Sequence, residues 1–285
     1  MSRPSFRSLF LVSLMGLACL WGCADDPVTS TVPSSDGTLI AYEVTGSGSP
    51  ALVFVHGWSC DRSYWEHQVE AFAADHQVVL IDLAGHGDSG CGRTEWTIPA
   101  FAADVKAVID DLDLAQVILI GHSMAGSVVA ETGALMPDRV VGLIGIDTLH
   151  DIQETYSAEQ IAGFTTPMAA NFPVTIDAFV RSMFLADADS SLVESVASDM
   201  ASAPPAIALD SLRHYLGWSI VPALDSYRPR VRCINAALWP AVVDHGLAHC
   251  EEFAVRTLEG TGHFLFLEKP EEFNLALAKA IAELH

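Results

Sequence analysis

The stretch VILIGHSMAG, residues 117–126, runs from four apolar residues through a glycine and a serine into small residues. Four consecutive apolar residues are typical of a strand covered on both faces of a sheet, and the small residues after Ser123 predict a helix that packs close to it. Ser123 then lies on the turn, where its backbone is strained and the Met124 amide at the helix N-terminus is placed to donate to an anion. Gly121 and Ala125 are small enough for strand and helix to approach without a clash.

Three more strand-like runs end in turns that contain histidine or glycine. In an open parallel sheet the chemistry lies at the carboxyl ends of the strands, so these turns are candidates for one site. After the first turn, the Trp58 amide is placed to supply a second hydrogen bond to an oxyanion. His263 lies on the loop after the last run. The runs with their turns are ALVFVHGW (51–58), VVLIDLAGHGDS (78–89) and FAVRTLEGTGH (253–263).

In this order, and over nearly the whole chain after its first two dozen residues, these motifs resemble the α/β-hydrolase superfamily. The resemblance implies an α/β fold with a mostly parallel sheet of the eight-stranded type, flanked by helices and carrying an inserted helical cap. It implies that Ser123 is the nucleophile at the elbow turn, here G-x-S-x-A where G-x-S-x-G is usual, and that His263 is its base. The amides of Trp58 and Met124 would form the oxyanion hole.

The acid of the triad departs from the commonest family pattern. Relatives most often carry it directly after the next-to-last strand, but residues 231–240 contain no carboxylate, and the first one beyond them is Asp244. Asp147 ends the strand that follows the elbow helix, which is where haloalkane-dehalogenase-like members place their acid. We therefore expect Asp147 to act as the acid, with Asp244 as the alternative. An aspartate at this point also occurs in relatives as a structural cap of the next turn.

This constellation predicts an exported serine hydrolase that cleaves a carboxylic ester through an acyl-enzyme intermediate. Lactone, thioester and carbon–carbon bond hydrolysis stay open. A serine at the elbow argues against haloalkane dehalogenase and epoxide hydrolase chemistry, because both need a carboxylate nucleophile. A catalytically weak small-molecule binding protein on the same fold is the alternative from another class.

The hydrophobic pattern predicts the arrangement of the remaining elements. A turn at residues 35–37 followed by an apolar run at 39–44 predicts an opening antiparallel hairpin. From about residue 150 to 225 short helical segments broken by prolines predict the cap, whose apolar side chains either line an acyl pocket or pack among themselves. Helices are expected over residues 64–74, 98–112, 123–135 and 271–283.

Composition fits one catalytic domain, over residues 38–285, within a chain of 285 residues of which 51% are hydrophobic. A net charge of −22 with only 14 Lys and Arg excludes a nucleic-acid partner, because phosphate binding needs clustered cations. We expect a small-molecule acyl substrate and no cofactor. Asp244, His245 and His249 are spaced as metal ligands on a helix, but no further ligand accompanies them and no metal is expected.

The pattern of the first residues is typical of a targeting segment. Arg3 and Arg7 precede an apolar run, so residues 1–22 are expected to be a signal peptide. The sequence Leu-Trp-Gly-Cys before and at Cys23 resembles a bacterial lipobox, which predicts lipidation of Cys23 and a tether over residues 23–37. Ordinary cleavage after Ala24 is the alternative. The protein would then be lipid-anchored in the cell envelope, its only contact with a membrane, or periplasmic or secreted.

Export into an oxidising compartment makes disulfides possible. Leaving aside those of the leader, four cysteines remain, and sequence allows three pairings. Cys60 and Cys91 follow loops that leave the same end of neighbouring strands, whereas Cys233 and Cys250 lie near the starts of the last two strands. We expect Cys60 to pair with Cys91 and Cys233 with Cys250. Free buried thiols are the alternative.

Overall fold

The computed structural model describes residues 28–284 and contains one eight-stranded sheet with the strand order β1-β2-β4-β3-β5-β6-β7-β8. The expected signal peptide, the lipidation of Cys23 and the start of the tether lie outside the described residues. The strands are β1 (Val28–Pro33), β2 (Leu39–Thr45), β3 (Ala51–Val55), β4 (Val78–Ile81), β5 (Val117–His122), β6 (Val140–Ile146), β7 (Arg230–Ala236) and β8 (Glu252–Leu258).

The sheet begins antiparallel and continues parallel. β1 and β2 form the expected hairpin, β2 pairs antiparallel with β4, and the strands from β4 to β8 are all parallel to one another. β3, β4 and β5 are buried at every position because helices cover both faces. The predicted fold class is confirmed. The tether expected over residues 23–37 needs correction, since Val28–Pro33 pairs along its length with β2 as a strand.

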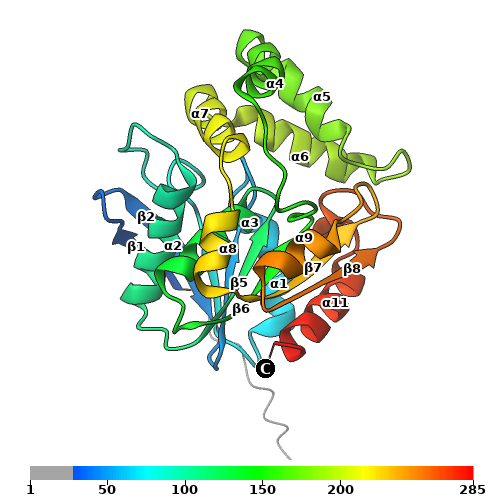
Figure 1. Cartoon of the computed structure of the whole chain (residues 1–285). Coiled ribbons are helices and arrows are strands. Elements are labelled where there is room, and N and C mark those ends of the chain that lie inside the picture. Colours follow the sequence, from blue (N-terminus) through cyan, green and yellow to red (C-terminus); the bar gives the residue numbers. More distant parts are fainter. Residues whose placement is uncertain (1–27, 285) are drawn as a thin grey trace, which may run out of the picture.

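Helices cover both faces of the sheet (Figure 1). α2, α3 and α8 pack side by side on one face, and α1 packs with α11 on the other. The helices of the body are α1 (Glu66–Phe72), preceded by a 3-10 turn at Arg62–Trp65, then α2 (Ile98–Asp111), α3 (Ala125–Leu135), α8 (Val221–Tyr227), α9 (Val243–His249), α10 (Leu265–Glu268) and α11 (Pro270–Ala282).

Four further helices form a cap over the carboxyl end of the sheet (Figure 1). Prolines shape it, because Pro173 and Pro205 lie in the first turns of two of its helices, where a missing N–H costs nothing. The first helix carries a capping box, in which Ser157 and Gln160 each bond to the other's backbone N–H. The cap helices are α4 (Ala158–Ala170), α5 (Phe172–Arg181), α6 (Ser190–Ser202) and α7 (Pro205–Leu216).

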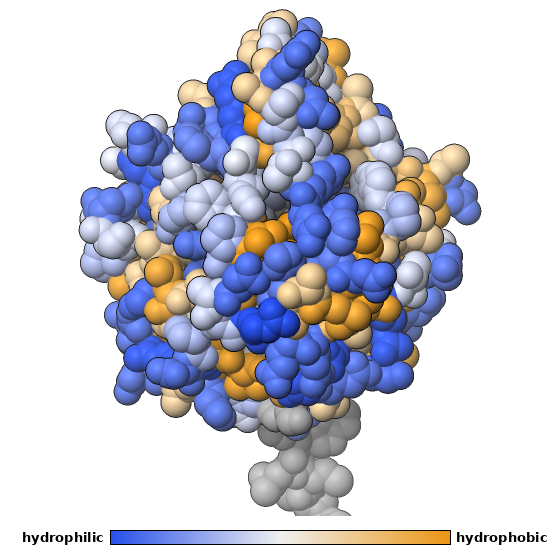
Figure 2. All heavy atoms as spheres, in the orientation of Figure 1, coloured by the Kyte–Doolittle hydropathy of each residue, from blue (hydrophilic) through white to orange (hydrophobic). Residues whose placement is uncertain are grey.

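Polar side chains predominate on the face shown in Figure 2, with apolar residues in scattered groups. This agrees with a net charge of −22, which keeps the surface strongly solvated. Among the helices of residues 28–284, none has the length and apolar character needed to cross a bilayer.

The four cysteines of the described chain are free, which corrects the two expected disulfides. Cys60 is buried with its thiol directed to the Trp58 carbonyl oxygen, 3.5 Å away, whereas Cys91 is exposed. Strand register places Cys233 beside Val255, five residues beyond Cys250, so the two thiols are offset along the strands. A disulfide needs Cα atoms within about 7 Å, a condition that cysteine spacing in the sequence does not test.

Candidate active site

Ser123 occupies a sharp turn between β5 and α3. Its φ is +53°, a left-handed conformation that is strained for a residue with a side chain. Neighbouring segments hold the turn, because the Ser123 N–H donates to the Ile146 carbonyl oxygen at 3.0 Å and Thr148 Oγ1 donates to the Ser123 carbonyl oxygen at 2.7 Å. The strain is thus stabilised from β6, and the hydroxyl is presented at the carboxyl end of the sheet.

Two glycines allow this close packing. A Cβ on Gly121 would lie 2.5 Å from the Ala125 carbonyl oxygen, and one on Gly126 would lie 2.4 Å from Thr148 Oγ1. The glycine that the usual motif carries at position 125 therefore has a counterpart one residue later, where it makes room for the threonine that holds the turn. Ala125 itself is buried without difficulty.

Gly121→Ala is expected to lower the free energy of unfolding by about 1–3 kcal/mol, because the added methyl group meets backbone and the strand cannot move aside. Gly163→Ala in α4 is the matched control. Its Cβ would meet nothing within 4 Å, and alanine in a helix interior is favoured by up to about 1 kcal/mol. Urea unfolding of both variants checks this, and an equal effect at both sites would contradict the close packing.

His263 lies on the loop after β8 and contacts Asp147, which follows β6. Its Nδ1 is 2.5 Å from Asp147 Oδ2, and both side chains are buried. The cap supports this loop, because the His263 N–H donates to the Met183 carbonyl oxygen at 2.9 Å. A Cβ on Gly262 would lie 2.4 Å from that same carbonyl oxygen, so only glycine lets the cap approach here. A neutral His263 bonded through Nδ1–H would leave Nε2 free to accept a proton.

Asp147 is held on its other side as well. Its Oδ1 accepts a hydrogen bond of 2.8 Å from the Ala236 N–H, and its φ of +42° places it on a turn as tight as that of Ser123. Burial raises the pKa of this carboxyl, but the His150 and His263 imidazoles and the Ala236 amide outweigh burial and hold the pKa below its ordinary range. Asp147 is therefore ionised at neutral pH.

Asp244, the alternative acid, lies in the first turn of α9 and is exposed. Its neighbours on that helix are engaged elsewhere, since His245 Nδ1 is 2.6 Å from Asp151 Oδ1 and His249 Nδ1 is 2.8 Å from Asp225 Oδ1. The structure thus brings Asp147, and not Asp244, to His263.

The two amides expected to form the oxyanion hole belong to buried residues on either side of Ser123. Within residues 28–284, neither the Trp58 N–H nor the Met124 N–H donates to a protein acceptor. Gly57 brings the first turn close, since a Cβ there would lie 3.4 Å from Ser123 Cβ. The Trp58 indole fastens this turn to the cap by donating to the Ala208 carbonyl oxygen at 2.7 Å.

Three more histidines near the site support loops. His56 bridges two turns, with its Nδ1 2.8 Å from the Gly57 carbonyl oxygen and its Nε2 accepting from the Leu83 N–H at 3.0 Å. His122 Nε2 is 3.1 Å from the His263 carbonyl oxygen. Burial lowers the pKa of His56 to about 4 and that of His86 to about 3, so both are neutral at ordinary pH.

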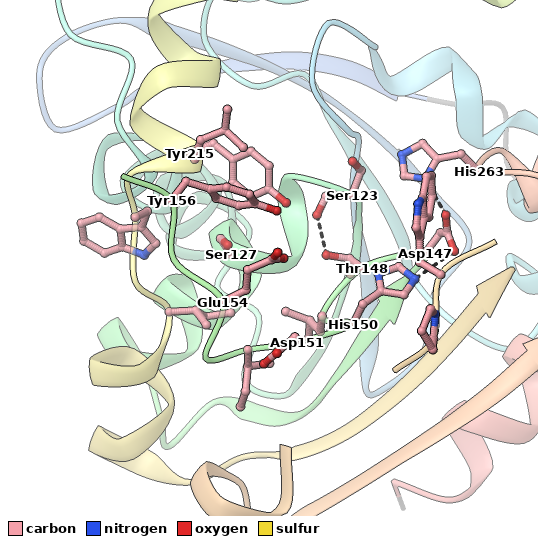
Figure 3. A pocket seen from close by; sticks show the side chains of 17 residues that line it. Ser123, Ser127, Asp147, Thr148, His150, Asp151, Glu154, Tyr156, Tyr215 and His263 are labelled. Atoms are coloured by element: carbon pink, nitrogen blue, oxygen red, sulfur yellow. Dashed lines mark hydrogen bonds and ion pairs between the residues drawn. The ribbon is translucent and has the colours of Figure 1, made fainter. Parts of the chain in front are cut away.

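The pocket at Ser123 and His263 has two parts (Figure 3 shows the larger). The small compartment, about 140 Å³, lies under the cap and is mostly apolar, with Phe164, Phe179 and Met200 among its lining residues. The large compartment, about 470 Å³, is lined by aromatic and polar side chains that include Glu154, Tyr156 and Trp239. Ser123 and His263 line both, so the two compartments meet at the candidate nucleophile. No hydrogen bond joins these two side chains within the described structure.

His150 and Trp239 also belong to the site, although sequence reasoning did not single them out. His150 Nε2 is 3.5 Å from Asp147 Oδ1, so a second imidazole lies beside the acid. The Trp239 ring contacts both imidazoles edge-on, with centroids 5.8 Å from His150 and 5.7 Å from His263. His150 lies three residues after Asp147, a spacing that could have predicted their contact. That prediction would have required Asp147 to be identified first as the acid.

A family profile and several known proteins match this chain. The profile described as "Alpha/beta hydrolase family" matches residues 52–276. An acetyltransferase component of an acetoin cleaving system from Pseudomonas putida is 35% identical over 46% of the chain, but the match spans only 34% of that protein. A karrikin insensitive 2 receptor from Petunia hybrida is 27% identical over 65% of the chain and 74% of its own length. An esterase from Exiguobacterium antarcticum superimposes with a TM-score of 0.79 at 19% identity, over 88% of this chain and 98% of the esterase.

Proposed function

The chain belongs to the alpha/beta hydrolase family, and from this we propose that it is a serine hydrolase that cleaves a carboxylic ester or a related acyl bond. The main support for this proposal is the contact of 2.5 Å between His263 Nδ1 and Asp147 Oδ2 in the pocket that Ser123 lines. This contact supports a triad in which the acid is Asp147, directly after β6, the strand that pairs with the strand before Ser123. The predicted leader supports the further proposal that the protein is exported and anchored through Cys23.

In the proposed mechanism Ser123 Oγ attacks the carbonyl carbon while His263 Nε2 takes the hydroxyl proton. Asp147 keeps the proton of His263 on Nδ1 and stabilises the imidazolium that forms. The amides of Trp58 and Met124 donate to the oxyanion. Both are available for this because neither donates to an acceptor within the described residues. His263 gives its proton to the departing alcohol, and water then hydrolyses the acyl-enzyme by the same steps to release the acid and restore Ser123.

The small compartment supports a short acyl group. Its volume of about 140 Å³ holds roughly five non-hydrogen atoms, if each occupies about as much space as a water molecule in the liquid. On a series of p-nitrophenyl esters we expect the largest kcat/KM at or below about five acyl carbons, and a fall of at least about tenfold at eight, since a longer chain has no room.

Phe164→Ala provides the sharper form of this experiment. Phe164 lines the small compartment and is 40% exposed, so its removal opens that compartment and is expected to shift the optimum to longer chains. Val174→Ala, on α5 at 64% exposure and outside the compartment, is the control. An optimum at long chains in the unaltered protein would contradict the assignment of the acyl group to this compartment.

A catalytically weak binding protein is the second candidate. The likeness to a karrikin insensitive 2 receptor favours it, because that relative is named for reception and the match covers most of its length. The same ester series separates the two candidates, since a binding protein would turn over none of the esters at a useful rate.

A further inference from the structure

The large compartment carries unbalanced negative charge. Among the described residues that line it there is no Lys or Arg, whereas three are carboxylates. Asp147 contacts His263, and Asp151 contacts His245 Nδ1 at 2.6 Å. Glu154 has no ion-pair partner in the described part of the chain; its neighbour is the Tyr156 hydroxyl, whose pKa is raised by burial and next by a hydrogen bond to this carboxylate. One carboxylate is therefore available to a bound molecule.

Aromatic residues line the same compartment as this carboxylate. Tyr156, Tyr215 and Trp218 line the compartment together with Glu154. In Figure 3 the carboxylate of Glu154 and the hydroxyls of Tyr156 and Tyr215 are turned toward the space beside Ser123 and Ser127. Burial, and next the charge of Glu154, raise the pKa of Tyr215 to about 12, so its hydroxyl stays neutral beside the carboxylate.

We propose that this compartment binds the leaving group of a cationic ester, an alcohol that carries an ammonium group, with Glu154 as the counter-ion and the aromatic side chains around it. This rests on the proposed function. Aromatic faces attract ammonium groups, and a carboxylate beside them adds Coulomb attraction. An anionic leaving group would meet Glu154 with no cation to offset it.

The geometry favours a cation over an uncharged polyol. Hydroxyl groups of a polyol would find the same oxygen acceptors, but they would leave the charge of Glu154 without a partner. Because Glu154 is exposed, salt would weaken its attraction for a cation, whereas recognition of a neutral molecule would change little. Salt dependence is therefore part of the test.

Binding to the Ser123→Ala variant, in which the ester persists, tests the proposal without turnover. Calorimetry would compare acetylcholine, the acetic ester of choline, with 3,3-dimethylbutyl acetate, which has the same shape but a carbon atom in place of the charged nitrogen. We expect Kd to be at least about tenfold lower for the choline ester at low salt, and the preference to shrink at high salt. Equal Kd values, no binding of the choline ester, or tighter binding of a glycerol monoester would overturn the proposal.

Glu154→Gln, in the same background, is expected to reduce the preference about tenfold. Glu159→Gln is the matched control, since Glu159 is an exposed carboxylate in the first turn of α4 that does not line the compartment. An equal reduction by both variants would mean that overall charge, and not the compartment, selects the cation. If the unaltered enzyme turns over the neutral ester while binding shows no preference for the cation, the hydrolase proposal stands and this inference alone fails.

Discussion

Ser123→Ala is expected to lower kcat/KM for p-nitrophenyl acetate by about 10⁴- to 10⁶-fold, because the variant has no oxygen nucleophile to form the acyl-enzyme. The loss should appear in kcat, since the compartments that bind the ester are unchanged. Steady-state kinetics measures both constants. The residual activity would reflect binding and the oxyanion hole alone.

Ser127→Ala is the control for this substitution. Ser127 lines the large compartment one helical turn beyond the elbow, so it offers a second hydroxyl close to the first. We expect this variant to keep kcat/KM within about tenfold of the unaltered protein. If Ser127→Ala were the more damaging change, or if Ser123→Ala kept full turnover, the assignment of the nucleophile would be wrong.

Asp147→Asn is expected to lower kcat by about 10⁴-fold, because an amide in place of the carboxylate favours the wrong tautomer of His263 and cannot stabilise the imidazolium. Asp244→Asn is the matched control. Its carboxylate is exposed on α9 and is expected to contribute less than about twofold. A larger loss in Asp244→Asn than in Asp147→Asn would mean that Asp244, beyond the next-to-last strand, is the acid of the triad.

Comparing the stability of Asp147→Asn with that of the unaltered protein tests whether Asp147 is ionised in the folded state. The pKa of Asp147 in the folded protein is held below its ordinary value of 3.8, so its charged form stabilises the fold above that pH. That contribution is lost as the pH falls below 3.8 toward the folded-state pKa. The difference in unfolding free energy between the unaltered protein and Asp147→Asn should therefore shrink in acid, and a constant difference would contradict an ionised Asp147.

Local sequence was enough to locate the elbow and the loop of His263. Both are short segments in which a strand-like run leads into a turn with glycine close before the functional side chain, and such patterns depend on few distant contacts. Asp147 was expected from the resemblance to haloalkane-dehalogenase-like members, after residues 231–240 offered no carboxylate at the commoner position. Its contact with His263 depends on the strand order β6-β7-β8, because Asp147 follows β6, His263 lies on the loop after β8, and the Ala236 N–H at the end of β7 holds Asp147 between them.

Other features depend on contacts between distant segments. The displaced glycine at position 126 is explained only by Thr148, which lies on another loop. The expected disulfides failed because pairing depends on strand register, which cysteine spacing does not reveal. The hairpin was expected, but its first strand was assigned to the tether, because the polar sequence of β1 gains strand structure only by pairing with β2. The two compartments arise where cap helices meet the sheet, and no single segment contains them.

The most direct test of the proposed triad is to react the protein with a fluorophosphonate and to map the adduct by peptide mass spectrometry. The triad predicts one adduct, on Ser123, which forms slowly in Asp147→Asn and at an unchanged rate in Asp244→Asn. An adduct on another residue, or labelling of Ser123 that is as fast without Asp147 as with it, would contradict the triad.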